Sequence, residues 1–317
     1  MKKRIALILV LVLLLGAAGC LAGFGAKREY AIDLIVKGTN MDFWKSVNGG
    51  AQAAASDYRA TVTMTGPAIE KDYQQQAGIL KSSVAQRPDA IVLAAADYEK
   101  MARPVQNAVD AGIPVVMVDS DVDSSRTVAY VGTDNLALGK KLADQLCRQV
   151  KGSGEVGVVS FMQNSFPAIQ REKGFRDAVR ANSRLAVLDT VYGYSDSAQA
   201  EKVTEELIAR HPKLKAVAAL NMWSSEGAAR ALSKLGRKDI RLFAIDCSPE
   251  LAMYMEDGVL SVALLQNPYQ MGYDSVETAC RYLRGDQVGD KFTDIYSVDI
   301  TTLFDDKYEQ LIFPFES

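Results

Sequence analysis

Polar and aromatic side chains recur directly after the short apolar runs of this chain. The runs are rich in Val, Ile, Leu and Ala, as in strands buried on both faces, and most precede the pattern of an amphipathic helix. Open α/β sheets bind ligands beyond the carboxyl ends of their strands, so these positions are the candidate site. They hold acids, an arginine, amides, a serine and two aromatics: Asp119, Asp246, Arg171, Asn40, Asn221, Gln266, Ser120, Phe43 and Trp44.

This set of side chains matches the chemistry of a sugar ring, which carries hydroxyls around its rim and C–H patches on its faces. Carboxylates accept hydrogen bonds from hydroxyls, arginine donates them, and carboxamides do both. Flat aromatic rings cover the faces of the sugar and exclude water, which strengthens each hydrogen bond. A hydrogen bond to an ionised group contributes about 1.5–3 kcal/mol, roughly twice a neutral one. We therefore expect a small polyol to bind here, without a metal or another cofactor.

The stretch GTNMDFWKS at 38–46 places two large aromatics where a strand turns into a helix. We expect Asn40 to cap this helix and Asp42 to lie in its first turn, where a negative charge is favourable. Phe43 and Trp44 are then expected to form a stacking wall for the ligand. The alternative is that both aromatics belong to the hydrophobic core at a domain boundary, and their spacing alone leaves this open.

Two successive series of strands and helices follow Tyr30. The expected strands are 31–37, 61–65, 90–94, 115–119 and 128–131, then 156–161, 187–192, 216–220, 241–246 and 261–266. Connections of helical length predict parallel strands, because antiparallel neighbours need only a short turn. The pattern therefore predicts two α/β lobes, with a division near Thr133–Asp134.

The N-terminal segment differs from the rest. A basic start at 2–4 precedes an uncharged stretch at 5–26, in which small residues lead to Cys20 in GAAGC. This resembles a bacterial lipobox and implies a secretory signal with a lipidated Cys20, although Ala17 stands where the motif most often has Leu. The alternative is an uncleaved membrane anchor, because the stretch is long enough to span a bilayer. Both interpretations place the chain from 29 onward outside the cytoplasm, at the membrane.

Composition limits the function further. The 317 residues carry a formal net charge of -3, which argues against nucleic acid as a partner, because such proteins normally show a basic stripe. Cys147, Cys247 and Cys280 show neither CxxC nor metal-ligand spacing, so we expect three buried thiols, with one disulfide as the alternative. His211 precedes a proline at an expected helix end and is interpreted as a surface residue.

From about Tyr30 to Val298 the chain resembles the ribose-type periplasmic sugar-binding proteins of ABC transporters. The resemblance is carried by GTNMDFWKSVNGG, AGIPVVMVDS, VGTDNLALGKKLA, REKGF and LLQNPYQMG. It implies the type I periplasmic-binding-protein fold, an α/β fold of two doubly wound parallel-sheet lobes joined by a three-strand hinge. The implied units are an anchor and tether at 1–29, an N-terminal lobe at 30–133 plus 267–299, and a C-terminal lobe at 134–266 plus 300–317.

The resemblance also implies roles for single residues, with the ligand clasped between the lobes. The family's ligand-binding positions fall on Phe43, Trp44, Asp119, Arg171, Asn221, Asp246 and Gln266, with Tyr194 or Ser195 at the position of the second-lobe aromatic. Ribose binders place an arginine directly after the first of these acids, and here that position is Ser120. A neutral hydroxyl in place of a bidentate donor implies a different ligand preference.

An enzyme is the less favoured interpretation. Asp119 and Asp246 could form the carboxylate pair of a glycosidase, but GxSxG is absent and the single histidine is poorly placed. The first turn is not GxGxxG, and Phe43 and Trp44 would obstruct a pyrophosphate. A DNA-binding repressor is excluded because the export signal occupies the place of its helix-turn-helix. We therefore expect a binding protein without catalysis.

Two protein partners are compatible with such a binding protein. A transport receptor presents its closed form to an ABC permease, whereas a sensor presents it to the outer domain of a histidine kinase. Both uses depend on lobes that close around the ligand because the ligand has a higher affinity for the closed state. We favour the permease, because transport is the commoner use.

Overall fold

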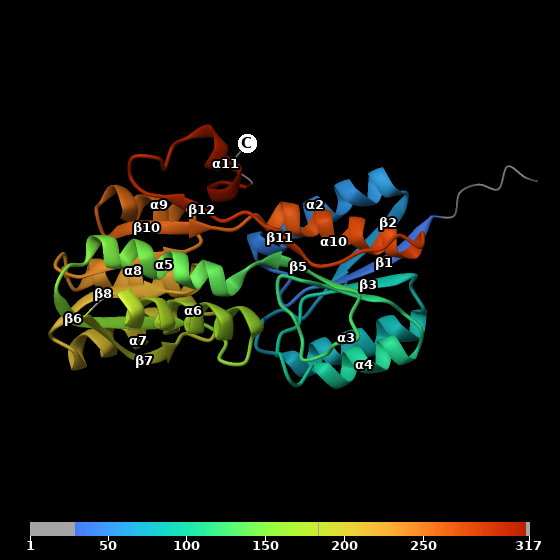
Figure 1. Cartoon of the computed structure of the whole chain (residues 1–317), viewed down its shortest axis with the longest axis horizontal. Helices are drawn as coiled ribbons and strands as arrows, with labels where there is room; N and C mark the ends of the chain where they lie inside the picture. The colour runs from blue at the N-terminus through green and yellow to red at the C-terminus, as the bar shows by residue number, and fades with distance from the viewer. Residues whose placement is uncertain (1–28, 183, 315–317) are drawn as a thin grey trace, which may run out of the picture.

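The computed structural model describes residues 29–182 and 184–314. Two lobes lie side by side along the long axis of the molecule, each built around one sheet (Figure 1). The expected signal, with Cys20, lies outside the described residues. Among the helices of the described part of the chain, none is both long and apolar enough to cross a membrane.

The first lobe contains a six-stranded parallel sheet in the order β11-β5-β4-β3-β1-β2. Its strands are β1 (Tyr30–Ile35), β2 (Ala60–Thr65), β3 (Ala90–Leu93), β4 (Val115–Val118), β5 (Ala129–Thr133) and β11 (Lys291–Thr293). One face is covered by α2 (Asp42–Tyr58) and α10 (Pro268–Leu283), the other by α3 (Tyr73–Gln86) and α4 (Ala102–Asp110). Neighbouring residues of β3, Ile91 and Val92, enter the cores on opposite faces, which explains why this strand is apolar at every position.

The second lobe repeats this plan with a six-stranded sheet in the order β12-β10-β9-β8-β6-β7. Its strands are β6 (Ser153–Ser160), β7 (Arg184–Tyr192), β8 (Leu214–Ala219), β9 (Arg241–Ile245), β10 (Leu260–Leu265) and β12 (Tyr296–Val298). One face is covered by α5 (Asn135–Gln149) and α6 (Phe166–Asn182), the other by α7 (Ser197–Arg210), α8 (Met222–Lys234), α9 (Pro249–Glu256) and α11 (Asp306–Ile312). The expected strands of this lobe pair in parallel, and only the edge strand β12, which was not among the expected strands, runs antiparallel, to β10, in the described sheet.

The described chain passes between the lobes three times, and these crossings form the hinge. The first lies between β5 and α5, at the division expected near Thr133–Asp134, and the second lies between β10 and α10. The third lies between Thr293 and Tyr296, so residues 296–298 belong to the second sheet rather than to the first lobe, where the expected boundaries placed them. Two α/β lobes joined by a three-strand hinge confirm the expected fold class.

Side-chain caps start the helices that follow the first two crossings. Asp134 Oδ1 accepts a hydrogen bond from Ala137 N at 2.9 Å, and Asn267 Oδ1 accepts one from Gln270 N at 3.0 Å. Pro268 opens α10, where its missing N–H costs no helical hydrogen bond. Each cap satisfies a backbone donor at the helix start and contributes about 1 kcal/mol. The chain therefore turns sharply into a helix as soon as it has crossed.

Helices α5 and α6 approach each other closely at two glycines. A Cβ atom at Gly139 would collide with the carbonyl group of Arg171, and one at Gly174 would collide with the carbonyl group of Leu136. Only a residue without a side chain permits such backbone contact. This packing fixes the position of α6, which carries Arg171.

Candidate ligand-binding site

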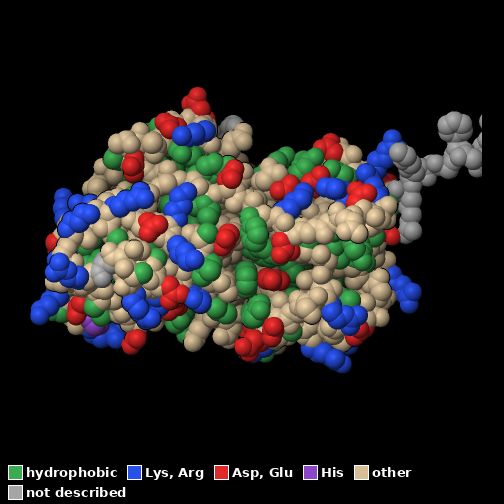
Figure 2. All heavy atoms as spheres, viewed as in Figure 1, with side chains coloured by type: hydrophobic (Ala, Val, Ile, Leu, Met, Phe, Trp, Pro, Cys, Tyr) green, Lys and Arg blue, Asp and Glu red, His purple; other side chains and the backbone are tan. Residues whose placement is uncertain are grey.

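A cavity of about 350 Å³ lies between the lobes. Most of the predicted site residues line it: Phe43, Trp44 and Asp119 from the first lobe, and Arg171, Asn221, Asp246 and Gln266 from the second. Figure 2 shows that apolar and acidic side chains also meet at the surface along the junction of the lobes. The strand-end positions thus converge on one cavity, although they come from two separate sheets.

Three predicted residues stand outside this cavity wall. Asn40 is exposed, and the N-cap of α2 is Met41 without a side-chain hydrogen bond, so the expectation that Asn40 caps this helix is wrong. Ser120 is fully buried behind the wall. Tyr194 is 52% exposed, while the adjacent Ser195 forms a hydrogen bond to the first lobe.

The two acids occupy equivalent positions in the lobes. Asp119 follows β4 and Asp246 follows β9, the third strand in the order of each sheet. Both have a left-handed backbone, with φ of +57° and +68°. Asp tolerates this region better than most residues, because its short polar side chain can form local hydrogen bonds. Such backbone conformations cost on the order of 1 kcal/mol and are typical of binding sites.

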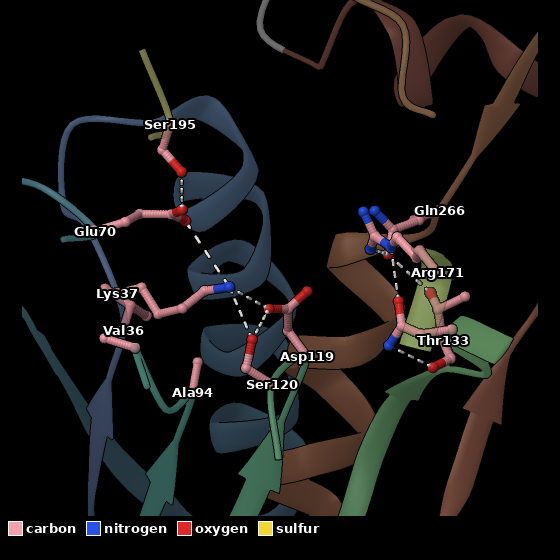
Figure 3. Close-up of polar contacts among 12 residues, drawn as sticks. Val36, Lys37, Glu70, Ala94, Asp119, Ser120, Thr133, Arg171, Ser195 and Gln266 are labelled. Carbon is pink, nitrogen blue, oxygen red and sulfur yellow. Dashed lines mark hydrogen bonds and ion pairs between the residues drawn. The ribbon is translucent and has the colours of Figure 1, made fainter. Parts of the chain in front are cut away.

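Asp119 is 5% exposed and belongs to a polar cluster with Lys37 (Figure 3). Lys37 Nζ lies 3.0 Å from Asp119 Oδ2 and donates to Ser120 Oγ at 2.8 Å. The Ser120 hydroxyl donates in turn to Asp119 Oδ2 at 2.7 Å. Glu70 Oε1 lies 3.9 Å from the same ammonium group. No hydrogen bond from the described residues reaches Asp119 Oδ1, so this oxygen remains to accept one from a ligand.

Arg171, on the second-lobe side, is buried and held by three acceptors. Its Nε donates to Asn135 Oδ1 and its Nη1 to the carbonyl oxygen of Leu220, both at 2.8 Å. Its Nη2 donates to Gln266 Oε1 at 2.8 Å, and Gln266 Nε2 donates to Asp246 Oδ1 at 2.9 Å. A guanidinium has five N–H groups, so two remain for a ligand. Gln266 therefore holds the arginine and the acid in place at the hinge.

Burial shifts the pKa values of two acids and one thiol in the second-lobe wall of the cavity. Burial raises the pKa of Asp246, and the charge of Arg171 opposes this shift. Burial also raises the pKa of Glu226, which lines the cavity and accepts a hydrogen bond from Ser248 Oγ at 2.8 Å. Burial raises the pKa of Cys247 to about 12, so this thiol is protonated at neutral pH and is a poor nucleophile.

The aromatics line the cavity from both lobes. Trp44 is 1% exposed and belongs to the core of the first lobe, as the alternative interpretation expected. It also lines the cavity, and its role as a stacking wall for a ligand stays a prediction. Phe43 packs edge to face against it, with 5.0 Å between ring centroids. Asp42 lies in the first turn of α2, as expected. The second lobe contributes Phe161, which directly follows β6 and was not singled out in the sequence.

Asn221 has a structural role as well as a place in the cavity wall. Its Oδ1 caps α8 by accepting a hydrogen bond from Ser224 N at 3.0 Å. The amide nitrogen remains to donate to a ligand, and the cap fixes its orientation. This amide is therefore positioned before any ligand binds.

Sequence reasoning missed four charged side chains of the cavity wall, one of which is Glu250, and one segment. The other three side chains are Lys37, Glu70 and Glu226, and the segment is residues 310–314. Lys37 follows the first apolar run, so the strand-end rule could have found it. Glu70 lies in the loop after β2 and was not singled out, although Arg171 lies further from the end of its strand. Residues 310–314, at the end of α11 and directly after it, are far from any strand end in the sequence, and only tertiary packing brings them to the cavity.

Residues 29–182 and 184–314 contain no group of three or more His, Cys, Asp or Glu that could hold a metal ion. The cysteines of this part of the chain form no disulfide with one another, and Cys247 and Cys280 are buried, whereas Cys147 is half-buried rather than buried as expected. His211 lies at the C-terminal end of α7, as expected.

The chain matches the periplasmic binding protein domain over residues 32–287. It is 27% identical over 271 residues to the ribose import binding protein of Escherichia coli (strain K12), an alignment that covers 84% of this chain and 89% of that protein. It is also similar to an ABC transporter solute binding protein from Agrobacterium vitis with bound D-fucose, with a TM-score of 0.85, 29% identity, and coverage of 89% of this chain and 100% of that one. The XylFII–LytSN complex contains a further similar chain, with a TM-score of 0.80 and 25% identity. The match covers 86% of this chain and 99% of that chain. The chain therefore belongs to the periplasmic binding protein family, among its ribose-type sugar-binding members, and has the type I periplasmic-binding-protein fold.

Proposed function

We propose that this protein is an extracytoplasmic sugar-binding lipoprotein that serves as the substrate-binding component of an ABC sugar transporter. The observation that supports this most is the cavity itself, whose polar groups come from both lobes and whose walls include aromatic rings. Asp119 contributes an acceptor from the first lobe, and Arg171 and Asp246 contribute donors and an acceptor from the second. A sugar that contacts both lobes is bound more tightly in the closed arrangement, which drives closure.

We infer binding without catalysis. The relatives are named as binding proteins, and the thiol in the cavity wall, Cys247, is held in its neutral form. Asp246 is tied to the hinge through Gln266, and Asp119 is tied to Lys37. Both acids are thus anchored as hydrogen-bond acceptors for hydroxyls.

The first experiment is a thermal-shift screen of the purified full-length protein over pentoses, hexoses, deoxyhexoses and inositols. A ligand that binds the folded state raises the melting temperature by mass action. At a ligand concentration of a hundred times Kd, the free energy of unfolding rises by about 2.7 kcal/mol. We expect at least one sugar to raise the melting temperature, with calorimetry giving one site per chain. If no sugar in the screen shifts the unfolding transition, the sugar-binding proposal fails.

Lipidation of Cys20 is part of the same proposal. It is supported by the small residues that lead to this cysteine, and periplasmic relatives fit an extracytoplasmic location. Mass spectrometry of protein extracted from membranes is expected to find a mature chain that begins at a diacylated Cys20. A chain that retains residues 1–19 would instead identify an uncleaved anchor.

A sensor is the second candidate, in which the closed protein signals to a histidine kinase at the membrane. It is favoured by the likeness to XylFII, which forms a complex with another protein, LytSN. Gentle extraction of the full chain from native membranes with the bound sugar, followed by identification of co-purified proteins, separates the two uses. Recovery of an ABC permease supports transport, whereas recovery of a sensor kinase supports signalling.

A further inference from the structure

The last helix of the described chain brings an apolar segment to the ligand cavity. Residues 310–314, at the end of α11 and directly after it, line the cavity together with strand-end residues of both lobes. We propose that this segment and Met222 form a second subsite, which holds an uncharged apolar group attached to the sugar. The preferred ligand is then a glycoside with an apolar aglycone, the non-sugar part of such a molecule. This inference deepens the proposed sugar-binding function and rests on it.

The layers of the second lobe place this subsite at the other end of the cavity from Arg171. Arg171 comes from α6, on one face of the second sheet, and residues 310–314 follow from α11, on the opposite face. Asn221 and Asp246 come from the ends of β8 and β9, between these two faces. Figure 1 shows α11 at the top of the second lobe, next to its junction with the first. The cavity therefore runs across the end of the sheet, past the groups proposed to bind the sugar.

The side chains at this end of the cavity are apolar and only partly covered. Met222, Leu311 and Phe313 pack against the core of the second lobe but stay half-buried, and Pro314 is half-buried as well. All four line the cavity. A ligand group that covers them removes apolar surface from water, which favours binding. An apolar group fits this wall better than hydroxyls do, because hydroxyls would be separated from water there.

The charges of the cavity wall argue against an anionic group in this subsite. The cations among the described lining residues are Lys37 and Arg171, and both belong to the polar groups of the sugar site. At the end near α9 and α11, the lining residues include Glu226 and Glu250. Arg230 donates to both oxygens of Glu250, at 2.6 and 2.5 Å, whereas no ion pair from the described residues reaches Glu226. A carboxylate on the aglycone would therefore meet an acid without a counter-ion, which disfavours binding.

The size of the cavity agrees with a ligand larger than one sugar ring. Its volume of about 350 Å³ falls within the range of roughly 300–1,000 Å³ of pockets that hold drug-sized ligands. The match to the periplasmic binding protein domain ends at residue 287, so residues 310–314 lie beyond the matched part of the chain. This part of the wall is thus an addition of this chain to the matched domain.

Calorimetry on the full-length protein tests the second subsite. The probes are D-glucose, D-galactose, D-xylose and D-fucose, with the methyl, 4-nitrophenyl and 4-carboxyphenyl glycosides of each in both anomers. For at least one sugar, the 4-nitrophenyl glycoside is expected to bind about tenfold to hundredfold more tightly than the methyl glycoside, the gain from burial of one aromatic ring. The 4-carboxyphenyl glycoside is expected to lose this gain because of its charge.

The variant Phe313→Ala shows whether this gain comes from the C-terminal segment. It is expected to weaken binding of the 4-nitrophenyl glycoside about tenfold, whereas affinity for the methyl glycoside stays within about twofold of the wild type. Phe313→Leu keeps an apolar side chain on the core and guards against a folding defect, with a smaller loss expected. The matched control is Phe304→Ala, whose ring is 66% exposed and stands outside the cavity wall, and its affinities are expected to be unchanged.

Three results would overturn the second subsite. The first is that free sugars bind but no 4-nitrophenyl glycoside binds more tightly than its methyl counterpart, and in that case the sugar-binding proposal itself still stands. The second is a 4-nitrophenyl gain that is unchanged in both Phe313 variants, and the third is equal affinity for the 4-carboxyphenyl and 4-nitrophenyl glycosides. If neither these probes nor the sugars of the thermal-shift screen bind, the sugar-binding proposal fails first, and this inference fails with it.

Discussion

At the scale of single residues, the site depends on carboxyl groups whose burial disfavours their charged form. Burial raises the pKa of Asp246, so the folded protein retains a proton there more readily than the unfolded chain does. The stability that this group contributes is full below its unfolded pKa and is lost as the pH rises through the raised folded pKa. Sugar binding has the opposite dependence, because the ionised carboxylate is the stronger acceptor.

The variant Asp246→Asn separates these two effects. At neutral pH it is expected to unfold at the same or a higher temperature than the wild type, because no charge is buried, and to bind sugar at least about tenfold more weakly. Burial also raises the pKa of Asp121 and Glu226, so the difference between wild type and variant isolates Asp246. Calorimetry and thermal unfolding between about pH 4 and pH 8 measure both trends. An affinity profile that keeps the wild-type pH dependence in the variant would contradict this assignment.

At the scale of elements, α6 places the main donor of the second lobe. Arg171 cross-links this helix to α5 through Asn135 and to the hinge through Gln266. Removal of its side chain would therefore break structural hydrogen bonds together with ligand contacts. Backbone packing at Gly139 offers a cleaner way to move the guanidinium, because a Cβ atom there would push against the carbonyl group of Arg171.

Gly139→Ala is expected to lower the free energy of unfolding by about 1–3 kcal/mol, as overpacking does, and to weaken sugar binding because α6 shifts. The matched control is Gly78→Ala in α3, where a Cβ atom meets nothing within 4 Å. This control is expected to stabilise the protein by about 0.5–1 kcal/mol through helix propensity and to leave affinity unchanged. Denaturant unfolding and calorimetry give both quantities. Equal stability and affinity in the two variants would show that the α5–α6 contact does not position Arg171.

At the scale of the whole molecule, the lobes touch each other on the side opposite the hinge as well as at it. Ser195 Oγ donates to Glu70 Oε2 at 2.6 Å across the cleft (Figure 3). Tyr98 N donates to the carbonyl oxygen of Asn164 at 2.8 Å. Glu70 also lies near the ammonium of Lys37, so one carboxylate connects the lobe contact with the site.

Loss of the Ser195 hydroxyl is expected to favour the open arrangement. In Ser195→Ala without sugar, small-angle scattering should give a larger radius of gyration, and sugar affinity should fall about tenfold, the loss of one hydrogen bond to a charged group. Ser82→Ala is the control, because its exposed hydroxyl donates to the carbonyl oxygen of Gly78 within its own helix and the described residues show no contact from it to the other lobe. Identical scattering and affinity in wild type and Ser195→Ala would mean that this contact does not bias closure.

The sequence by itself determined the α/β class, the two lobes and the acids at the strand ends. These follow from local rules, because periodicity shows which runs are strands, and parallel strands place the residues that follow them at one edge of the sheet. Within each lobe this rule explains the strand-end positions of Asp119 and Asp246. It was the family resemblance that implied one cavity for residues of both lobes, and Asp119, Asp246 and Arg171 are found to line it.

Only the tertiary structure decided which of these groups meet and what each one does. Lys37 reaches Asp119 from a strand that is not its neighbour in the sheet, and Glu70 reaches Ser195 from the other lobe. Asn40 is a case in which a local rule failed. Asparagine is a favoured N-cap residue, but α2 begins after Met41. Such pairings depend on the order of the strands, the closure of the lobes and the reach of the side chains. These are set by contacts between residues far apart in the chain, so no local sequence pattern predicts them.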